Sequence, residues 1–354
     1  MRDILRQPRE LQRTVDFLLG AGRPALDRAA TAIRNARHVY LTGMGSSWHA
    51  ALGAGPLFHL GARPVYMQDV SELLHFPTLP PDSVVIVISR SGRSIEVVNL
   101  LAKVHNSRVT VIGITNSEDG PLAREAQISI VVSTEMDHAI SVNTFSTLAA
   151  TAGVLASAVR GSFDAHLATL LTRAVEKTAW AIAGWQAQIA HTPWLAPRAV
   201  PYFLARGSSL GSCHEAKLLW EEGVKSPATA MGTGSFRHGP QEMVTKDARF
   251  GMWIDGERMR GQDLAVARDL RRLGASVMLI GQDLPKDAAD LVFQLPATPP
   301  DWQFLIDIIP VQLAAERLAQ LSEVDCDSFR FCSFIVEDEY GLLREEGRAP
   351  KDEK

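Results

Sequence analysis

Residues 84–94 read VVIVISRSGRS, an apolar run that ends in a loop of hydroxyl groups with one glycine. A short β-branched run bounded by turn residues is typical of a strand buried on both faces of a parallel sheet. The next residues, 95–104, have helical spacing, so the free amide groups of a helix N-terminus point at the same loop. The loop therefore predicts an anion site, with phosphate as the expected anion. The alternative is that Ser94 only caps the helix and that the other serines are turn residues.

The composition is that of a globular protein large enough for two domains. The chain has 354 residues, of which 46% are hydrophobic and 21% are charged. The net charge of -4, without a basic cluster among aromatic residues, argues against a nucleic-acid partner. No apolar leader and no run of eighteen apolar residues occurs, so we expect neither export nor a membrane segment. The three cysteines have no CxxC spacing, which favours the reducing cytoplasm and predicts no metal site; no cofactor is expected either.

Alternating strand and helix patterns predict an α/β fold of two tandem doubly wound domains, each with a mostly parallel sheet flanked by helices. We expect strands at 38–42, 65–68, 84–89, 110–115, 128–133, 202–205, 250–254, 276–280 and 291–295. We expect helices after 47, at 95–105 and 120–126, across 144–190, after 209, and at 258–273 and 302–322. The predicted units are N-terminal helices at 1–36, a first domain at 37–190, a second at 198–336, and a charged, poorly ordered tail at 337–354.

The second domain repeats a unit of the first. YLTGMGSS at 40–47 and YFLARGSS at 202–209 both have the pattern of a strand, a Gly/Ser turn and the start of a helix. Two related sheets are therefore predicted. In each, a ligand is expected at the carboxyl ends of the strands.

The sequence GMGSSW at 43–48 must be compared with the dinucleotide-binding fingerprint, which also lies between a strand and a helix. Trp48 stands in place of the third glycine, and no GxxxxGK[ST] sequence occurs, so neither NAD nor an ATP P-loop is expected. Two serine-rich loops after neighbouring strands can instead hold a phosphate without a lysine. The candidate ligand-binding residues are Gly45, Ser46, Ser47, Ser89, Arg90, Ser91 and Ser94.

A second group of candidate residues lies in the stretch 215–240, EAKLLWEEGVKSPATAMGTGSFRHGP. Glu215 and Glu222 are seven residues apart, so both carboxylates project from one face of a helix, and His238 follows in a glycine-rich loop. A carboxylate base and a histidine are the groups needed to open a sugar ring and move a proton between adjacent carbons. The alternative is that Glu215, Glu221 and Glu222 form a solvated helix face and that His238 is a turn residue.

These motifs resemble the sugar isomerase (SIS) domain family, in particular the isomerase half of glucosamine-6-phosphate synthase and the related phosphosugar deaminases and deglycases. The similarity runs from QP at 7–8 to VD at 324–325 and includes GMGSS, SRSGRS and the whole stretch 204–240. The segment DHAISVNTFST at 137–147 resembles the ligand-covering segment of the family, at Ser141 and Thr147.

The resemblance implies a role for each main candidate. Glu222 stands where the family has its proton-shuttling base, His238 where it has its ring-opening histidine, and Glu215 and Ser141 among the substrate-binding residues. Because the family supplies this histidine from the neighbouring subunit, the resemblance implies a homodimer with a shared active site. The implied ligand is a small phosphorylated sugar or amino sugar.

Two departures from the family bear on the reaction. The chain begins at Met1, just ahead of the region of similarity, so we expect no glutaminase domain and no glutamine-dependent amidotransfer. The family commonly ends with a lysine that can form a Schiff base with the open sugar, whereas DCDSFRFCSFIVE at 325–337 has Cys332 at that position. No lysine occurs between Lys286 and Lys351, so unless the tail lysines fold back, turnover must rest on enolisation by Glu222.

Two functions from different classes remain open at this point. One is an enzyme, a phosphosugar isomerase or aminosugar-phosphate deaminase that moves a proton between C1 and C2. The other is a sensor that binds a sugar phosphate without turnover, which the missing lysine would suit. The presence of both Glu222 and His238 favours the enzyme.

Overall fold

The structure is a computed structural model that describes residues 1–60, 64–331, 333–339 and 341. Cys332 and most of the predicted tail, residue 340 and residues 342–354, lie outside the described residues. The predictions made for them are therefore not tested. Within the described ranges, no helix is long and apolar enough to cross a membrane.

The first five strands form one wholly parallel sheet with the order β2-β1-β3-β4-β5. Its strands are β1 (His38–Thr42), β2 (Tyr66–Met67), β3 (Ser83–Ser89), β4 (Thr110–Thr115) and β5 (Ile128–Val131). Every residue of β3 is buried, as the apolar run predicts for a central strand of a parallel sheet. We call this sheet and the helices packed on it the first lobe.

The last five strands form a second parallel sheet, in the order β7-β6-β8-β9-β10. These strands are β6 (Pro201–Ala205), β7 (Thr229–Gly232), β8 (Arg249–Trp253), β9 (Ser276–Gly281) and β10 (Leu291–Gln294). Counted from its own first strand, the second sheet has the same order as the first. The repeated sequence unit thus corresponds to a repeated topology, and we call this half the second lobe.

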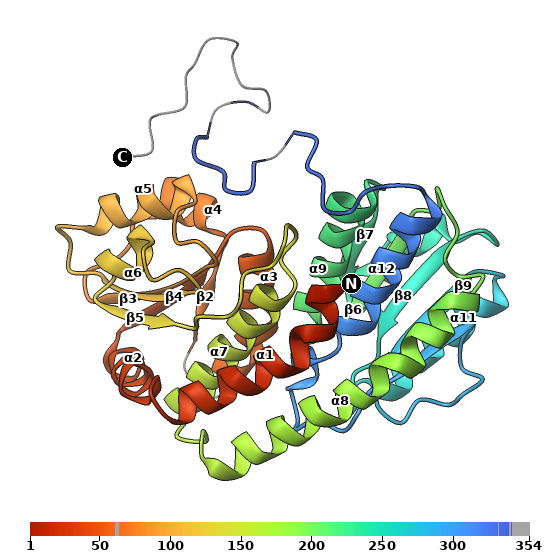
Figure 1. Cartoon of the computed structure of the whole chain (residues 1–354), viewed down its shortest axis with the longest axis horizontal. Helices are drawn as coiled ribbons and strands as arrows, with labels where there is room; N and C mark the ends of the chain where they lie inside the picture. The colour runs from red at the N-terminus through yellow and green to blue at the C-terminus, as the bar shows by residue number, and fades with distance from the viewer. Residues whose placement is uncertain (61–63, 332, 340, 342–354) are drawn as a thin grey trace.

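Helices cover both faces of the first sheet (Figure 1). Side chains of β3 alternate: Val84, Ile86 and Ile88 enter a large central core, while Val85 and Val87 enter an outer core. The outer core is completed by α4 (Val70–His75), α5 (Ile95–Val104) and α6 (Pro121–Glu125). The central core lies between the two sheets and includes residues of α1 (Arg2–Leu19), α2 (Arg23–Asn35), α3 (Ser46–His59), α7 (Asn143–Val159) and α8 (Ala165–His191).

The second sheet completes the same central core from the other side. Phe203, Trp253 and Ile280 face inward, where α9 (Ser209–Leu219) and α12 (Ile309–Leu321) pack. Leu204, Met252 and neighbours face outward against α10 (Thr233–Phe236) and α11 (Arg260–Arg272). Three short turns, η1 (Trp220–Val224), η2 (Pro240–Met243) and η3 (Gln303–Leu305), complete the described elements. One continuous core therefore joins the lobes.

The predicted α/β architecture is confirmed at the level of two parallel sheets flanked by helices. The strand β7 and the helix α4 were not predicted, because their residues are few and β7 is built from TAMG, without β-branched alternation. The region 144–190 is two helices, broken between α7 and α8, and the helix expected at 302–322 begins at Ile309. The domain boundaries drawn from the sequence stay a prediction.

Candidate functional site

The two serine loops of the first lobe lie side by side at the point where the strand order reverses. Because β1 pairs with β3, the loops that follow them share the carboxyl edge of the sheet, which is the usual ligand position of such folds. Gly45 and Gly92 have φ angles of +55° and +64°, which a side chain would strain, so each loop needs its glycine. The predicted convergence of the loops is thus present.

Ser89 and Ser91 in these loops have hydroxyl protons left to donate. Ser89 Oγ accepts from the Gly92 amide at 3.1 Å, and Ser91 Oγ accepts from the Arg93 amide at 3.2 Å. A hydroxyl that accepts a backbone bond still has its own O–H for a ligand. Ser94 occupies the N-cap position of α5 but makes no side-chain capping bond, whereas the bonds of Ser89 and Ser91 to loop amides also fit the alternative that these two are turn residues. The loops therefore offer several donors to an anion.

Glu215 of the second lobe reaches into this edge of the first lobe. Its side chain is fully buried, with Oε1 accepting from Ser46 Oγ at 2.9 Å and Oε2 lying 2.7 Å from His49 Nδ1. Two polar partners compensate for the removal of this carboxylate from water. Glu215 is thus no part of a solvated helix face, whereas Glu221 is exposed and pairs with Lys217 at 3.0 Å.

A close approach of two helices makes the contact between Glu215 and His49 possible. A Cβ atom added to Gly211 of α9 would lie 2.5 Å from the His49 carbonyl oxygen and 2.6 Å from the Gly53 amide nitrogen of α3. The backbones of α3 and α9, the helices that follow the two repeated turns, therefore touch. His214 lies close to His49, with 5.8 Å between ring centroids, and burial lowers the pKa of His214 to about 4.

Glu222 lies on η1, where α9 widens into a π-helical turn; such turns are often found at functional sites. Burial raises the pKa of the Glu222 carboxyl to about 7, and the negative charge of Glu215 adds to this rise. The positive charges of Arg90 and Lys225 oppose it. A carboxyl group with this pKa can gain and lose a proton near neutral pH, as a general base must.

Arg90 connects the phosphate loop to two other segments. Its guanidinium donates to Ser141 Oγ at 2.9 Å and to the Phe334 carbonyl at 3.1 Å, and it lies 4.1 Å from the centre of the Phe334 ring. The C-terminal segment also places the Val336 carbonyl 3.0 Å from the Ile95 amide, at the start of α5. The segment that contains Phe334 thus lies over the serine loop, and burial lowers the pKa of Arg90.

The structure does not bring every predicted residue to this place. His238 is exposed in the loop after α10, and within the described part of the chain it takes no part in the interactions of Glu215, Glu222 and Arg90. Thr147 is buried inside α7, with its hydroxyl bonded to the Asn143 carbonyl at 2.8 Å. Ser47, by contrast, stays at the serine-loop edge, because it lies in the first turn of α3 with its side chain buried.

Sequence reasoning missed three residues that organise the site: His49, Asp137 and Phe334. Asp137 accepts from the amides of Val142, Asn143 and Thr144 and so fixes the start of α7 beside Ser141. An aspartate shortly before a helix is a recognisable capping signal. The roles of His49 and Phe334 arise from contacts between segments distant in sequence, which no local pattern reveals.

Comparison with known proteins agrees with this geometry. A family model of the SIS domain matches residues 32–160. The isomerizing glutamine–fructose-6-phosphate aminotransferase of Pyrobaculum aerophilum is 25% identical over 332 residues, which cover 89% of this chain and 53% of that protein. The chain thus spans about half the length of the curated relatives it matches.

Two solved structures have the same fold. The C-terminal domain of glucosamine-fructose-6-phosphate aminotransferase from Francisella tularensis has a TM-score of 0.81 at 20% identity, covering 92% of this chain and 96% of that one. Glucosamine-6-phosphate deaminase from Thermotoga maritima has a TM-score of 0.79 at 20% identity, covering 95% and 98%. With the family match and the serine loops of the first lobe, these likenesses lead to one conclusion: residues 32–160 match the SIS domain, and the chain as a whole has the fold of these two structures.

Proposed function

We propose that the protein is an enzyme acting on a phosphorylated sugar or amino sugar, either an isomerase or an aminosugar-phosphate deaminase. The observation that carries this proposal is Glu222, a half-buried carboxyl group with a pKa of about 7 beside the serine loops. The aminotransferase and deaminase similar to this chain act, by their names, on sugar phosphates. A reaction on a sugar phosphate is therefore supported both by the pKa of Glu222 and by the names of the similar proteins.

In the proposed reaction, the hydroxyls of Ser47, Ser89, Ser91 and Ser94 bind the phosphate group. A hydrogen bond to a charged group contributes about 1.5–3 kcal/mol, so several such donors can hold a dianion without a lysine. Ser89 and Ser91 are buried, which protects these bonds from competition by water. Arg90 and Ser141, bonded to one another, form a further wall of the site.

Glu222 carries out the proton transfer. As a carboxylate it takes a proton from C2 of an open-chain aldose, or from C1 of a ketose, leaving an enediolate or the corresponding enolamine anion. It then returns the proton to the other carbon, while a proton passes between the two heteroatoms on C1 and C2. The nearby Glu215 carboxylate makes Glu222 a stronger base, while Arg90 limits this effect. In isomerisation and in deamination alike, this transfer is the common step.

His238 opens the sugar ring and, in this proposal, comes from the second subunit of a homodimer. Its exposed position away from Glu222 in a single chain is compatible with an active site shared between subunits. Mixing Glu222→Gln and His238→Ala chains should then restore part of the activity that each parent lacks. Mixed dimers as inactive as both parents would contradict the sharing of the site.

The second lobe, with its matching strand order, is proposed to be a second SIS domain. The free thiols Cys213 and Cys326 favour a reducing compartment, so we propose the cytoplasm as the place of action.

A screen for ligand and product tests the proposed function. Thermal shift against phosphorylated sugars and amino sugars should identify at least one stabilising sugar phosphate, because a ligand that binds only the native state raises its stability. Each stabilising compound is then incubated with the protein and assayed for an isomeric product and for released ammonia. Stabilisation without either product for every compound would favour the sensor and contradict the enzyme.

A further inference from the structure

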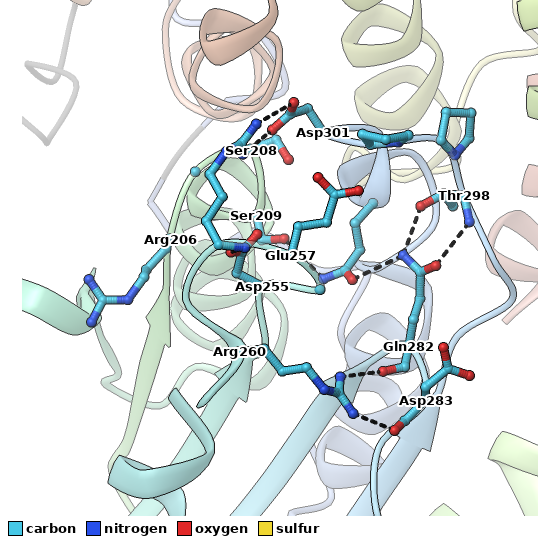
Figure 2. Close-up of a pocket in the computed structure, with 16 residues that line it drawn as sticks. Arg206, Ser208, Ser209, Asp255, Glu257, Arg260, Gln282, Asp283, Thr298 and Asp301 are labelled. Carbon is cyan, nitrogen blue, oxygen red and sulfur yellow. Dashed lines mark hydrogen bonds and ion pairs between the residues drawn. The ribbon is translucent and has the colours of Figure 1, made fainter. Parts of the chain in front are cut away.

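The second lobe contains a pocket at the position that corresponds to the phosphate site of the first lobe (Figure 2). Its volume is about 270 Å³. The pocket is lined by the turn after β6, residues 206–209, and by the loop after β8, residues 255–258. Since β6 and β8 are neighbours where the second strand order reverses, this pocket lies at the edge of the second sheet that is equivalent to the serine-loop edge of the first.

The side chains of the second pocket differ in charge from those of the first site. Where the loop after β3 reads SRSGRS, the loop after β8 reads IDGERM, so carboxylates stand in place of phosphate-binding hydroxyls. Glu257 points into the middle of the pocket (Figure 2), and within the described part of the chain its carboxylate pairs with no cation. An anionic ligand would be repelled here.

The arginines that line the pocket already form hydrogen bonds and ion pairs with protein oxygens. Each guanidinium has protein partners: Arg206 with Asp263 at 2.7 Å, Arg258 with both carboxylate oxygens of Asp301 at 2.6 and 2.8 Å, and Arg260 with the carbonyls of Gln282 and Asp283. Arg206 bonds through Nε alone, whereas Arg258 and Arg260 direct both terminal nitrogens at protein oxygens. What the pocket offers a ligand is mainly hydrogen-bond acceptors.

Ser208 gives the pocket a hydroxyl group that is available to a ligand. Its side chain lines the pocket and is only 6% exposed, yet in the described ranges its hydroxyl has no hydrogen-bond partner. A hydroxyl that lines an open pocket without a protein partner can donate to, and accept from, a ligand that enters the pocket. The neighbouring Ser209 differs, because Asp307 accepts from it at 2.7 Å.

We propose that this second pocket binds a small hydroxyl-rich amine without a phosphate group, a molecule of the class of a free amino sugar. Ser208 bonds a ligand hydroxyl, and the carboxylate of Glu257 bonds the ammonium or a further hydroxyl. The volume suits a single sugar ring better than a larger ligand. This inference does not depend on the proposed function, because none of the residues that line this pocket takes part in the proposed reaction.

Titration with glucosamine, at a pH at which its amine is protonated, tests the proposal by calorimetry or ligand-observed NMR. Wild type and Ser91→Ala, which is altered only in the first lobe, should bind glucosamine equally. Glu257→Gln should weaken binding about tenfold, as expected for the loss of a charge-assisted hydrogen bond. Glucose, which lacks the amine, should bind more weakly than glucosamine.

Several results would overturn the proposal: no saturable binding of glucosamine to wild type, equal affinity for glucose, or unchanged affinity in Glu257→Gln. Binding lost in Ser91→Ala but kept in Glu257→Gln would place the amine in the first lobe, which also overturns it. If Glu257→Gln fails to fold, Ser208→Ala decides the question. It should weaken glucosamine severalfold, and unchanged affinity in that variant counts against the pocket.

Discussion

The two lobes share strand order and turn geometry but differ in the chemistry of their ligand edges. Gly45 and Gly207 both have φ of +55° in the repeated turns. In the first lobe Ser46 is tied to Glu215, whereas in the second lobe Ser209 is tied to Asp307 and Ser208 is left without a partner. The same backbone therefore presents hydroxyl donors at one edge and carboxylate acceptors at the other. The fold positions a ligand, and a few loop side chains decide which ligand it is.

The largest effect is expected at Glu222, which we propose acts in the first site although it lies on a second-lobe helix. Glu222→Gln keeps the volume but cannot accept the proton, so kcat for the sugar phosphate should fall by about 10²–10⁴-fold. Affinity for the ligand, measured by thermal shift, should remain. The matched control is Glu221→Gln, an exposed neighbour that should leave kcat unchanged. A similar loss in both variants would show that the effect is not specific to the proposed base.

A smaller loss is expected when one phosphate donor is removed. Ser91→Ala should lower phosphosugar affinity about ten- to a hundredfold, since it deletes one hydrogen bond to a charged group. Ser162→Ala, at the far end of α7, removes a hydroxyl that only bonds the Ser157 carbonyl, and should have no effect. Unchanged affinity in Ser91→Ala would remove the phosphate from this loop.

The pH dependence of catalysis should follow the carboxyl group of Glu222. Since Glu222 must be deprotonated to act as a base, kcat/KM should rise with pH through about 7 and fall about tenfold per unit below it. Glu215→Gln should move this acidic limb to lower pH, because Glu215 raises the pKa of Glu222, and Arg90→Gln should move it to higher pH. Shifts of both variants in one direction would contradict the proposed charge balance.

The smallest effect concerns the repeated glycines. Gly45→Ala and Gly207→Ala should each lower stability by about 1–2 kcal/mol, because both adopt positive φ. A new Cβ meets no atom within 4 Å at either position, so backbone strain is the only cost. Melting temperatures should thus fall equally, while phosphosugar affinity falls only in Gly45→Ala. Unequal losses of stability would show that the turns at Gly45 and Gly207 differ in structure despite their equal φ angles.

Much of the fold was open to prediction because its central strands are unbroken apolar runs. Residues of β3, β4 and β9 could hardly be anything but buried strands, and the Gly/Ser turns marked the start of α3 and α9. The strand β7 was not predicted, because Ala, Met and Gly have no clear preference for strands. The extent of α12 was misjudged because Pro310 in its first turn and a 3-10 turn before it share the same apolar pattern.

The candidate site was only partly open to prediction. The serines and Glu215 could be picked out by residue type and spacing, but the pairing of Glu215 with His49 depends on two glycines that let α3 and α9 touch. The pKa of Glu222 depends on burial and on charges from Arg90 and Glu215, which are distant in sequence or on another turn. Such properties are set by tertiary packing. A local pattern cannot supply them.

The central claim is that Glu222 abstracts a proton from a sugar phosphate bound at the first-lobe site. Proton exchange in heavy water tests this claim most directly. Each stabilising compound is incubated with the protein in deuterium oxide, and the recovered sugar is examined by NMR at C1 and C2. We predict deuterium at one of these carbons with wild type and with Glu221→Gln, and none with Glu222→Gln. Absence of deuterium in wild type for every bound sugar phosphate, or equal incorporation by Glu222→Gln, would contradict the account.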